Sequence, residues 1–361
     1  MKRNLSTFFF ILSSFFFFHC FFLNAEEIEF FKKFEIGSEE NREEMLFKII
    51  DVRADRDGNI FIVDYGNNCI KKFSMNGNFL KKVGRRGQGP SEMNNPIGID
   101  IDQKGNIYLN DLGNRRINVY DKNLNYIRTI KLNKSMSMED VFIVREGNLL
   151  IFRSARIIGD KYFNLFSIDG VHIRSFYDEL HPFAPKMESM KELRNNLLTF
   201  VYLPAIANLN QDKTRIAFTY KIPQSPYKIH IMDIKGNITK VIEKKIKGYN
   251  PKEQKENIGH IISKNKNQLK NHTVLIMLED LHFTKENYLV VQRKDELYIN
   301  RSLDKFLMPI DVFSPDGDLI KEEMKFTEKI SSIDSNDNVY TIIEDEQGIF
   351  KVAVYALRIK K

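Results

Sequence analysis

One local pattern recurs along this chain, and it constrains the fold more than any other feature. The segment Asp55-Arg-Asp-Gly-Asn-Ile-Phe-Ile-Val-Asp64 returns as Asp102-Gln-Lys-Gly-Asn-Ile-Tyr-Leu-Asn-Asp111. In both segments a polar Gly-Asn turn leads into a short apolar run, and such internal repetition is typical of repeat architectures. Weaker copies of the turn and strand occur at Gly147-Asn148, Thr214-Arg215, Glu286-Asn287 and Asp337-Asn338. The sequence therefore predicts six copies of one supersecondary unit.

Each copy contains the material for four strands. In the second copy, apolar residues alternate with small or polar residues over 97–101, 107–111, 117–120 and 126–130. A period of two predicts strands, and the tight Gly, Asn or Asp turns between them are typical of antiparallel hairpins. Four short antiparallel strands form a propeller blade. The predicted fold is an all-β, six-bladed β-propeller of four-stranded antiparallel blades.

The two ends of the predicted propeller are related to each other. The sixth copy ends in the strand 349–359 and lacks the late turn that precedes a fourth strand in the other copies. The segment 30–37, Phe-Phe-Lys-Lys-Phe-Glu-Ile-Gly, is close to the fourth strand of the first copy at 79–84. We expect the N-terminal strand to complete the last blade, because closure removes an open sheet edge that would promote aggregation.

The first residues predict export. Residues 1–25 have a basic start, a Phe-rich apolar run and a terminal Ala25, which is the pattern of a signal peptide. Two alternatives stay open: an uncleaved membrane anchor, and a lipid-modified Cys20. The propeller then occupies 26–361, in the periplasm, on the cell surface or in the medium. Cys69 would be the one cysteine left, so no internal disulfide is expected.

Two motifs in the first two copies resemble a known repeat. Asp64-Tyr-Gly-Asn-Asn-Cys-Ile70 and Asp111-Leu-Gly-Asn-Arg-Arg-Ile117 resemble the NHL repeat. Gly84-Arg-Arg-Gly-Gln-Gly-Pro-Ser-Glu92, followed by Pro96, is similar to the blade connector of secreted bacterial NHL-like propellers. The resemblance implies a six-bladed ring, used mostly for binding and in a few members for metal-dependent lyase or lactonase-like chemistry. We expect Asp64 and Asp111 themselves to be structural, accepting backbone N–H groups in Asx turns.

The predicted ligand-binding surface is the face that carries the blade connectors and the loops between second and third strands. Long insertions are expected on it near 177–204, with a helix over 186–200, and near 243–278. Arginine guanidinium groups suit carboxylate, phosphate or sulfate groups. The opposing interpretation makes each arginine a solvated loop charge. The candidate ligand-binding residues are Arg85, Arg86, Gln88, Arg115, Arg116, Arg153 and Arg156.

Metal chemistry is the main alternative. Zinc needs three or four N, O or S ligands, and among the histidines only His282 falls in a predicted innermost strand. A calcium site would use carboxylates at strand ends, such as Asp140 and Asp280. Because Asp140, Asp280 and His282 come from only two blades, we expect no cofactor, with calcium or zinc as the alternative.

Composition excludes two further classes of protein. With 42% hydrophobic and 29% charged residues the chain is not disordered, and a net charge of +7 over 361 residues is too dilute for nucleic-acid binding. The predicted function is an exported, monomeric, non-enzymatic binding or scaffold propeller for a partner protein or an anionic glycan. It would contact a membrane only through an uncleaved N-terminal segment. The alternative is a metal-dependent lyase or lactonase-like hydrolase with its site in the central channel.

Overall fold

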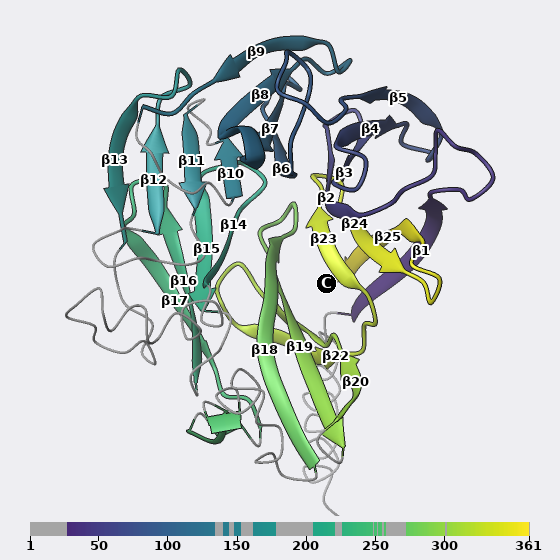
Figure 1. The fold of residues 1–361 in the computed structure, drawn as a ribbon. Coiled ribbons are helices and arrows are strands. Elements are labelled where there is room, and N and C mark those ends of the chain that lie inside the picture. Colours follow the sequence, from purple (N-terminus) through teal and green to yellow (C-terminus); the bar gives the residue numbers. More distant parts are fainter. Residues whose placement is uncertain are drawn as a thin grey trace, which may run out of the picture.

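The chain folds into six antiparallel sheets arranged around a central channel (Figure 1). The computed structural model describes residues 27–133, 140–143, 148–152, 162–177, 205–220, 226–247, 249–250, 252–254, 256–257, 272–299 and 302–360. Six sheets confirm the predicted six-bladed propeller. Within this described part of the chain, no helix combines the length and the apolar character needed to cross a membrane.

The blades follow one another along the sequence, each built from the channel outward. Blades 1 and 2 consist of β2 (Ile49–Ala54), β3 (Ile60–Asp64), β4 (Cys69–Phe73) and β5 (Phe79–Val83), then β6 (Pro96–Ile101), β7 (Ile107–Asp111), β8 (Arg116–Tyr120) and β9 (Tyr126–Ile130). Blades 3 and 4 consist of β10 (Asp140–Ile143), β11 (Leu149–Phe152), β12 (Phe163–Phe166) and β13 (His172–Phe176), then β14 (Ala205–Leu209), β15 (Arg215–Tyr220), β16 (Tyr227–Asp233) and β17 (Ile238–Lys244). The strands of blade 2 lie where the sequence predicts them.

Blades 5 and 6 depart from the simple repeat. Blade 5 consists of β18 (His272–Phe283), β19 (Leu289–Ile299), β21 (Ile310–Phe313) and β22 (Leu319–Met324), with the extra strand β20 (Ser302–Leu307) paired to β19. Blade 6 consists of β23 (Lys329–Ile333), β24 (Asn338–Glu344), β25 (Phe350–Lys360) and β1 (Glu27–Ile36). The insertion expected over 243–278 therefore ends earlier, because β18 already begins at His272. The helix expected over 186–200 lies outside the described residues.

The N-terminal strand closes the ring, as predicted. β1 pairs antiparallel with β25 along its length, from Glu27 opposite Lys360 to Ile36 opposite Val352. It is thus the outermost strand of blade 6, and Figure 1 shows β1 beside β25 in one blade. The chain runs directly from β1 of blade 6 to β2 of blade 1, and the two blades share a buried cluster that includes Ile36, Val52 and Val352.

The core lies between neighbouring blades rather than within one sheet. Every residue of β3 and β7 is buried, because another blade packs against each face, whereas the outermost strand β5 alternates in exposure. Phe61 and Ile70 of blade 1, for example, share one cluster with Leu109 and Tyr120 of blade 2. Each such side chain contributes roughly 1.5–3 kcal/mol to stability.

Basic side chains on the outermost strands fasten each blade to the next. Each donates to a main-chain carbonyl in the turn between the third and fourth strands of the following blade, and the four cases run from blade 1 to blade 5. They are Lys81 to Asn123, Arg128 to Ile168, Arg174 to Ile234 and Lys240 to Pro315. Each of these hydrogen bonds thus connects a blade to the blade that follows it in the sequence.

Candidate functional site

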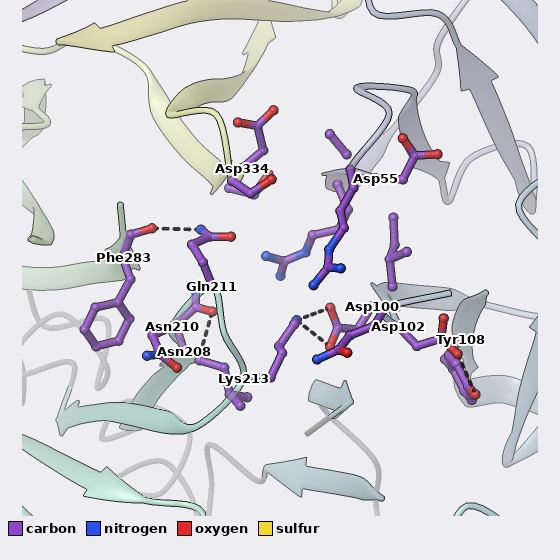
Figure 2. Close-up of a pocket in the computed structure, with 18 of the residues that line it drawn as sticks. Asp55, Asp100, Asp102, Tyr108, Asn208, Asn210, Gln211, Lys213, Phe283 and Asp334 are labelled. Atoms are coloured by element: carbon purple, nitrogen blue, oxygen red, sulfur yellow. Dashed lines mark hydrogen bonds and ion pairs between the residues drawn. The ribbon is translucent and has the colours of Figure 1, made fainter. Parts of the chain in front are cut away.

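A cavity of about 520 Å³ lies where the turns after the six innermost strands converge on the channel (Figure 2). It is lined by residues 53–56, 100–104, 106, 108, 148, 168, 208–211, 213, 282–283 and 332–335. All six blades contribute to this lining, and most of the lining side chains are charged or carry an amide or hydroxyl group. A cavity of this size accommodates a small ligand.

Three of the turns hold their own carboxylates. The Asp55 carboxylate accepts hydrogen bonds from the main-chain N–H and the side-chain amide of Asn59, both at 2.9 Å. Asp102 accepts the equivalent pair from Asn106, both at 2.8 Å. Asp334 repeats the arrangement in blade 6 with the residue four positions later, at 2.9 Å. These Asx-type turns use the oxygens of three aspartates that line the cavity, so these oxygens already have hydrogen-bond donors within the fold.

The turn of blade 4, residues 210–214, is built differently. Asn210 caps it by accepting the N–H of Thr214 at 2.9 Å. The side-chain amide of Gln211 donates to the carbonyls of Phe283 and Ile333, at 2.9 and 2.7 Å. This turn is therefore tied to blades 5 and 6, and Figure 2 shows Gln211 reaching toward Phe283.

Lys213 ties the same turn to blade 2. Its Nζ lies 2.6 and 2.8 Å from the two carboxylate oxygens of Asp100. The two residues line one cavity although blade 3 lies between their blades along the chain, and Figure 2 shows them facing each other. The contact places a bidentate ion pair inside the cavity, where partial burial strengthens it.

Further cations line the cavity on the blade 1 and blade 2 side. Arg53 Nε lies 3.3 Å from Asp51, whose other carboxylate oxygen accepts the N–H of Ile99 at 2.9 Å. Burial raises the pKa of Asp51, and the Arg53 guanidinium opposes that rise. Arg56 and Lys104 are exposed, and within the described residues their side chains make no hydrogen bond or ion pair. The charges of the lining that have no protein partner are thus positive.

The metal candidates are only partly brought together. Asp280 Oδ2 lies 3.7 Å from His282 Nε2, and His282 lines the cavity. The amide of Asn208 donates to the carbonyl of Leu281 at 2.8 Å and lies 3.4 Å from His282 Nδ1. Burial lowers the pKa of His282, which favours the neutral imidazole. Asp140 is the first residue of β10, and no described group of three His, Cys, Asp or Glu side chains is placed to hold a metal ion.

The predicted arginine site lies at the opposite ends of the strands. β6 begins at Pro96, after the connector, and ends at Ile101, before the cavity turn; the connector and the cavity are therefore at opposite ends of the channel. Arg85 is 82% exposed and pairs with Glu92 at 2.9 Å. The remaining candidates here, Arg86, Gln88 and Arg115, are exposed, and Arg153 and Arg156 lie outside the described residues.

Arg116, by contrast, is the first residue of β8, and it holds the connector in place. Its Nε donates to the buried carboxylate of Asp111 at 2.8 Å. Its Nη atoms donate to the main-chain carbonyls of Gln88, Gly89 and Glu92 at 2.8–2.9 Å. Because this guanidinium is 12% exposed and fully occupied by its own chain, it holds the connector rather than facing a ligand.

Both repeat aspartates are structural, as predicted, but only Asp64 accepts a backbone N–H from the turn that follows it; the backbone N–H bonded to Asp111 comes from the preceding connector. Asp64 accepts the N–H and the side-chain amide of Asn67, at 3.2 and 2.8 Å. Asp111 accepts the main-chain N–H of Asn94 at 2.7 Å and the side-chain amide of Asn114 at 2.8 Å. Both carboxylates therefore join the loop between the second and third strands to the connector that precedes the blade.

The sequence interpretation missed the cavity residues Arg53, Arg56, Lys104 and Lys213. A signal for Lys213 is present in the repeats themselves. When the turns are aligned, Lys213 occupies the position of Gly58 and Gly105, the glycines on which the repeat was recognised. The sequence therefore distinguishes the turn of blade 4 from the two glycine-containing turns, although it does not show what Lys213 contacts.

Comparison with known families places this fold. Residues 29–231 match the sequence profile of DUF5128, a family described as a 6-bladed beta-propeller. The chain belongs to this family. The DUF5128 propeller is similar in structure to a DUF4221 member from Bacteroides vulgatus ATCC 8482, with 12% identity, a TM-score of 0.59, and coverage of 94% of this chain and 100% of that one.

A second solved structure has the same fold. It is a protein of Bacteroides fragilis NCTC 9343 described as exported, with 12% identity and a TM-score of 0.57, covering 93% of the DUF5128 propeller and 96% of that chain. At such identities the likeness concerns the fold alone. The search of curated proteins found no match.

Proposed function

We propose that this DUF5128 propeller is an exported, monomeric, non-enzymatic protein that binds a small anionic ligand, such as an acidic sugar, in the cavity at the turn end of its channel. One observation carries the proposal. Three lining aspartates are satisfied by their own turns, whereas Arg56 and Lys104 have no protein partner within the described residues. The lining therefore offers an anion two cationic groups that no protein carboxylate pairs with, although it contains as many acidic as basic groups.

The other parts of the proposal rest on the sequence. Residues 1–25 support export, and the motifs at 64–70 and 111–117 support an NHL-like type of propeller. A metal-dependent lyase or hydrolase is the weaker candidate, because Asp280 and His282 have no third ligand among the described residues. A partner protein with an acidic patch would use the exposed Arg85, Arg86 and Arg115 at the connector end instead.

Two matched double variants test which end of the channel binds anions. Arg56→Glu/Lys104→Glu reverses the two cavity cations, and Arg85→Glu/Arg86→Glu reverses two exposed cations at the connector end. Both change the net charge equally. Binding of D-glucuronate, sulfate and neutral D-glucose is measured by isothermal titration calorimetry at low and high salt, because surface charge effects are screened by salt.

We expect wild-type protein to bind the anions more tightly than glucose. The cavity variant should lose about tenfold in affinity, since each exposed charge contributes on the order of 1 kcal/mol or less. The connector variant should bind like wild type. The proposal is wrong if neither anion binds better than glucose, or if only the connector variant loses affinity.

A further inference from the structure

Lys213 occupies a backbone conformation that favours glycine. The turns of blades 1 and 2 have Gly58 and Gly105 at this position, with φ of 81° and 82°. Lys213 has φ of 62° in the equivalent turn of blade 4. A side chain with a Cβ is strained in this left-handed region, so a lysine here is disfavoured by local structure alone. Local structure alone therefore gives no reason for a lysine here, whereas a contact of its side chain does.

That contact is the ion pair with Asp100 inside the cavity. Asp100 is 7% exposed and Lys213 is 24% exposed, so the carboxylate is nearly covered while part of the lysine side chain remains accessible. A lysine ammonium has three N–H donors, and the two carboxylate oxygens take two of them. One donor of a partly accessible ammonium is left for another acceptor.

The rest of the turn fixes where this ammonium can go. Gln211 is bonded to the carbonyls of Phe283 and Ile333, and Asn210 Oδ1 accepts the N–H groups of both Thr214 and Arg215. With its backbone held by blades 5 and 6 and by its own cap, the turn presents Lys213 across the channel toward blade 2. The ammonium is positioned before any ligand arrives, which lowers the entropic cost of binding.

We propose that Lys213 is the specificity-determining residue of the cavity: its remaining N–H donor binds the carboxylate or sulfate group of the ligand, and Asp100 moderates the affinity by holding a negative charge beside that group. This inference rests on the proposed function and names the residue that recognises the anion. Lys213 thus selects anionic over neutral ligands, while Asp100 keeps the cavity from retaining every anion tightly.

Three variants test the roles of the pair. Lys213→Gly restores the residue of blades 1 and 2 and relieves the backbone, but it also leaves the nearly covered Asp100 without its counter-charge, so its Tm is measured alongside its binding to show that it is folded. Asp100→Asn removes the competing charge with little change of shape. Lys285→Ala is the matched control, because Lys285 is an exposed lysine in the corresponding turn of blade 5 that does not line the cavity.

The affinity of the full propeller for D-glucuronate and for sulfate is measured by titration calorimetry. Lys213→Gly and Asp100→Asn should change this affinity in opposite directions. Lys213→Gly should weaken both anions about tenfold, which corresponds to about 1.4 kcal/mol. Asp100→Asn should tighten both several-fold, because a nearby negative charge is removed. Lys285→Ala should stay within twofold of wild type.

The outcomes separate this inference from the proposed function. If wild type binds the anions and Lys213→Gly binds them equally well, Lys213 is structural and the inference is wrong while the function stands. If Asp100→Asn weakens binding, Asp100 positions rather than moderates, and the second half of the inference is wrong. If wild type binds neither probe, the proposed function fails and this inference fails with it.

Discussion

The two ends of the channel use the same residue types in opposite ways. At the connector end, Arg116 is enclosed by Asp111 and three main-chain carbonyls, so its charge is consumed by the fold. At the turn end, Asp102 is satisfied within its own turn and nearby Lys104 is left without a partner among the described residues. The presence of charged residues in a sequence therefore does not mark a binding site. The informative residues are the charged side chains that have no protein partner after folding.

The largest test of this comparison removes one carboxylate from each end of blade 2. Asp111→Ala should lower the free energy of unfolding by about 3–5 kcal/mol, because it leaves the nearly buried Arg116 without its counter-charge. Asp102→Ala should cost only about 1–2 kcal/mol, since a turn loses hydrogen bonds but no buried ion pair. Urea unfolding followed by circular dichroism measures both. Equal losses would contradict the distinction between the two ends.

A smaller effect concerns the pH dependence of the turn end. Burial lowers the pKa of His282 from its ordinary value of 6.5, so the unfolded chain takes up a proton at a higher pH than the folded one. Folded-state stability should therefore fall as the pH drops below about 6.5, by at most about 1.4 kcal/mol per pH unit for this one group, until the folded-state pKa is passed.

His282→Gln should remove that component. The Tm of wild type and variant is measured between pH 7.5 and 5, and the difference in slope, not the absolute Tm, is the result. A variant that follows the wild-type slope would show that His282 is not kept neutral by the cavity wall.

The smallest expected effect is an absence of reaction at the connector end. Cys69 begins β4 there, is fully buried, and has its pKa raised to about 12 by burial. Native protein treated with iodoacetamide at pH 8 should show no alkylation of Cys69 by peptide mass mapping, because thiolate is scarce and access is closed. Urea-unfolded protein is the positive control. Rapid native labelling would mean that this end opens and is not sealed as the structure has it.

Much of the fold could be predicted because its signals are local. Turns such as 102–106 and the alternating strands that follow them recur within one blade, and the similarity of 30–37 to 79–84 predicted the closing strand β1. The site was predicted less well. The arginines of the connector face included Arg116, but its main-chain acceptors lie more than twenty positions earlier, and nothing local in the sequence links them to it.

The sequence by itself determined the six blades, the order of their strands and the closure of the ring. These features depend on turns and alternating apolar residues, which are formed by residues close together in the sequence. Only the tertiary structure decided where the unpaired charge lies. Lys213 and Asp100 are 113 positions apart, and neither residue carries a local mark of the other. Their pairing exists because the ring brings the turn of blade 4 and the inner strand of blade 2 to one cavity. The same geometry leaves Arg56 and Lys104 without a protein partner among the described residues.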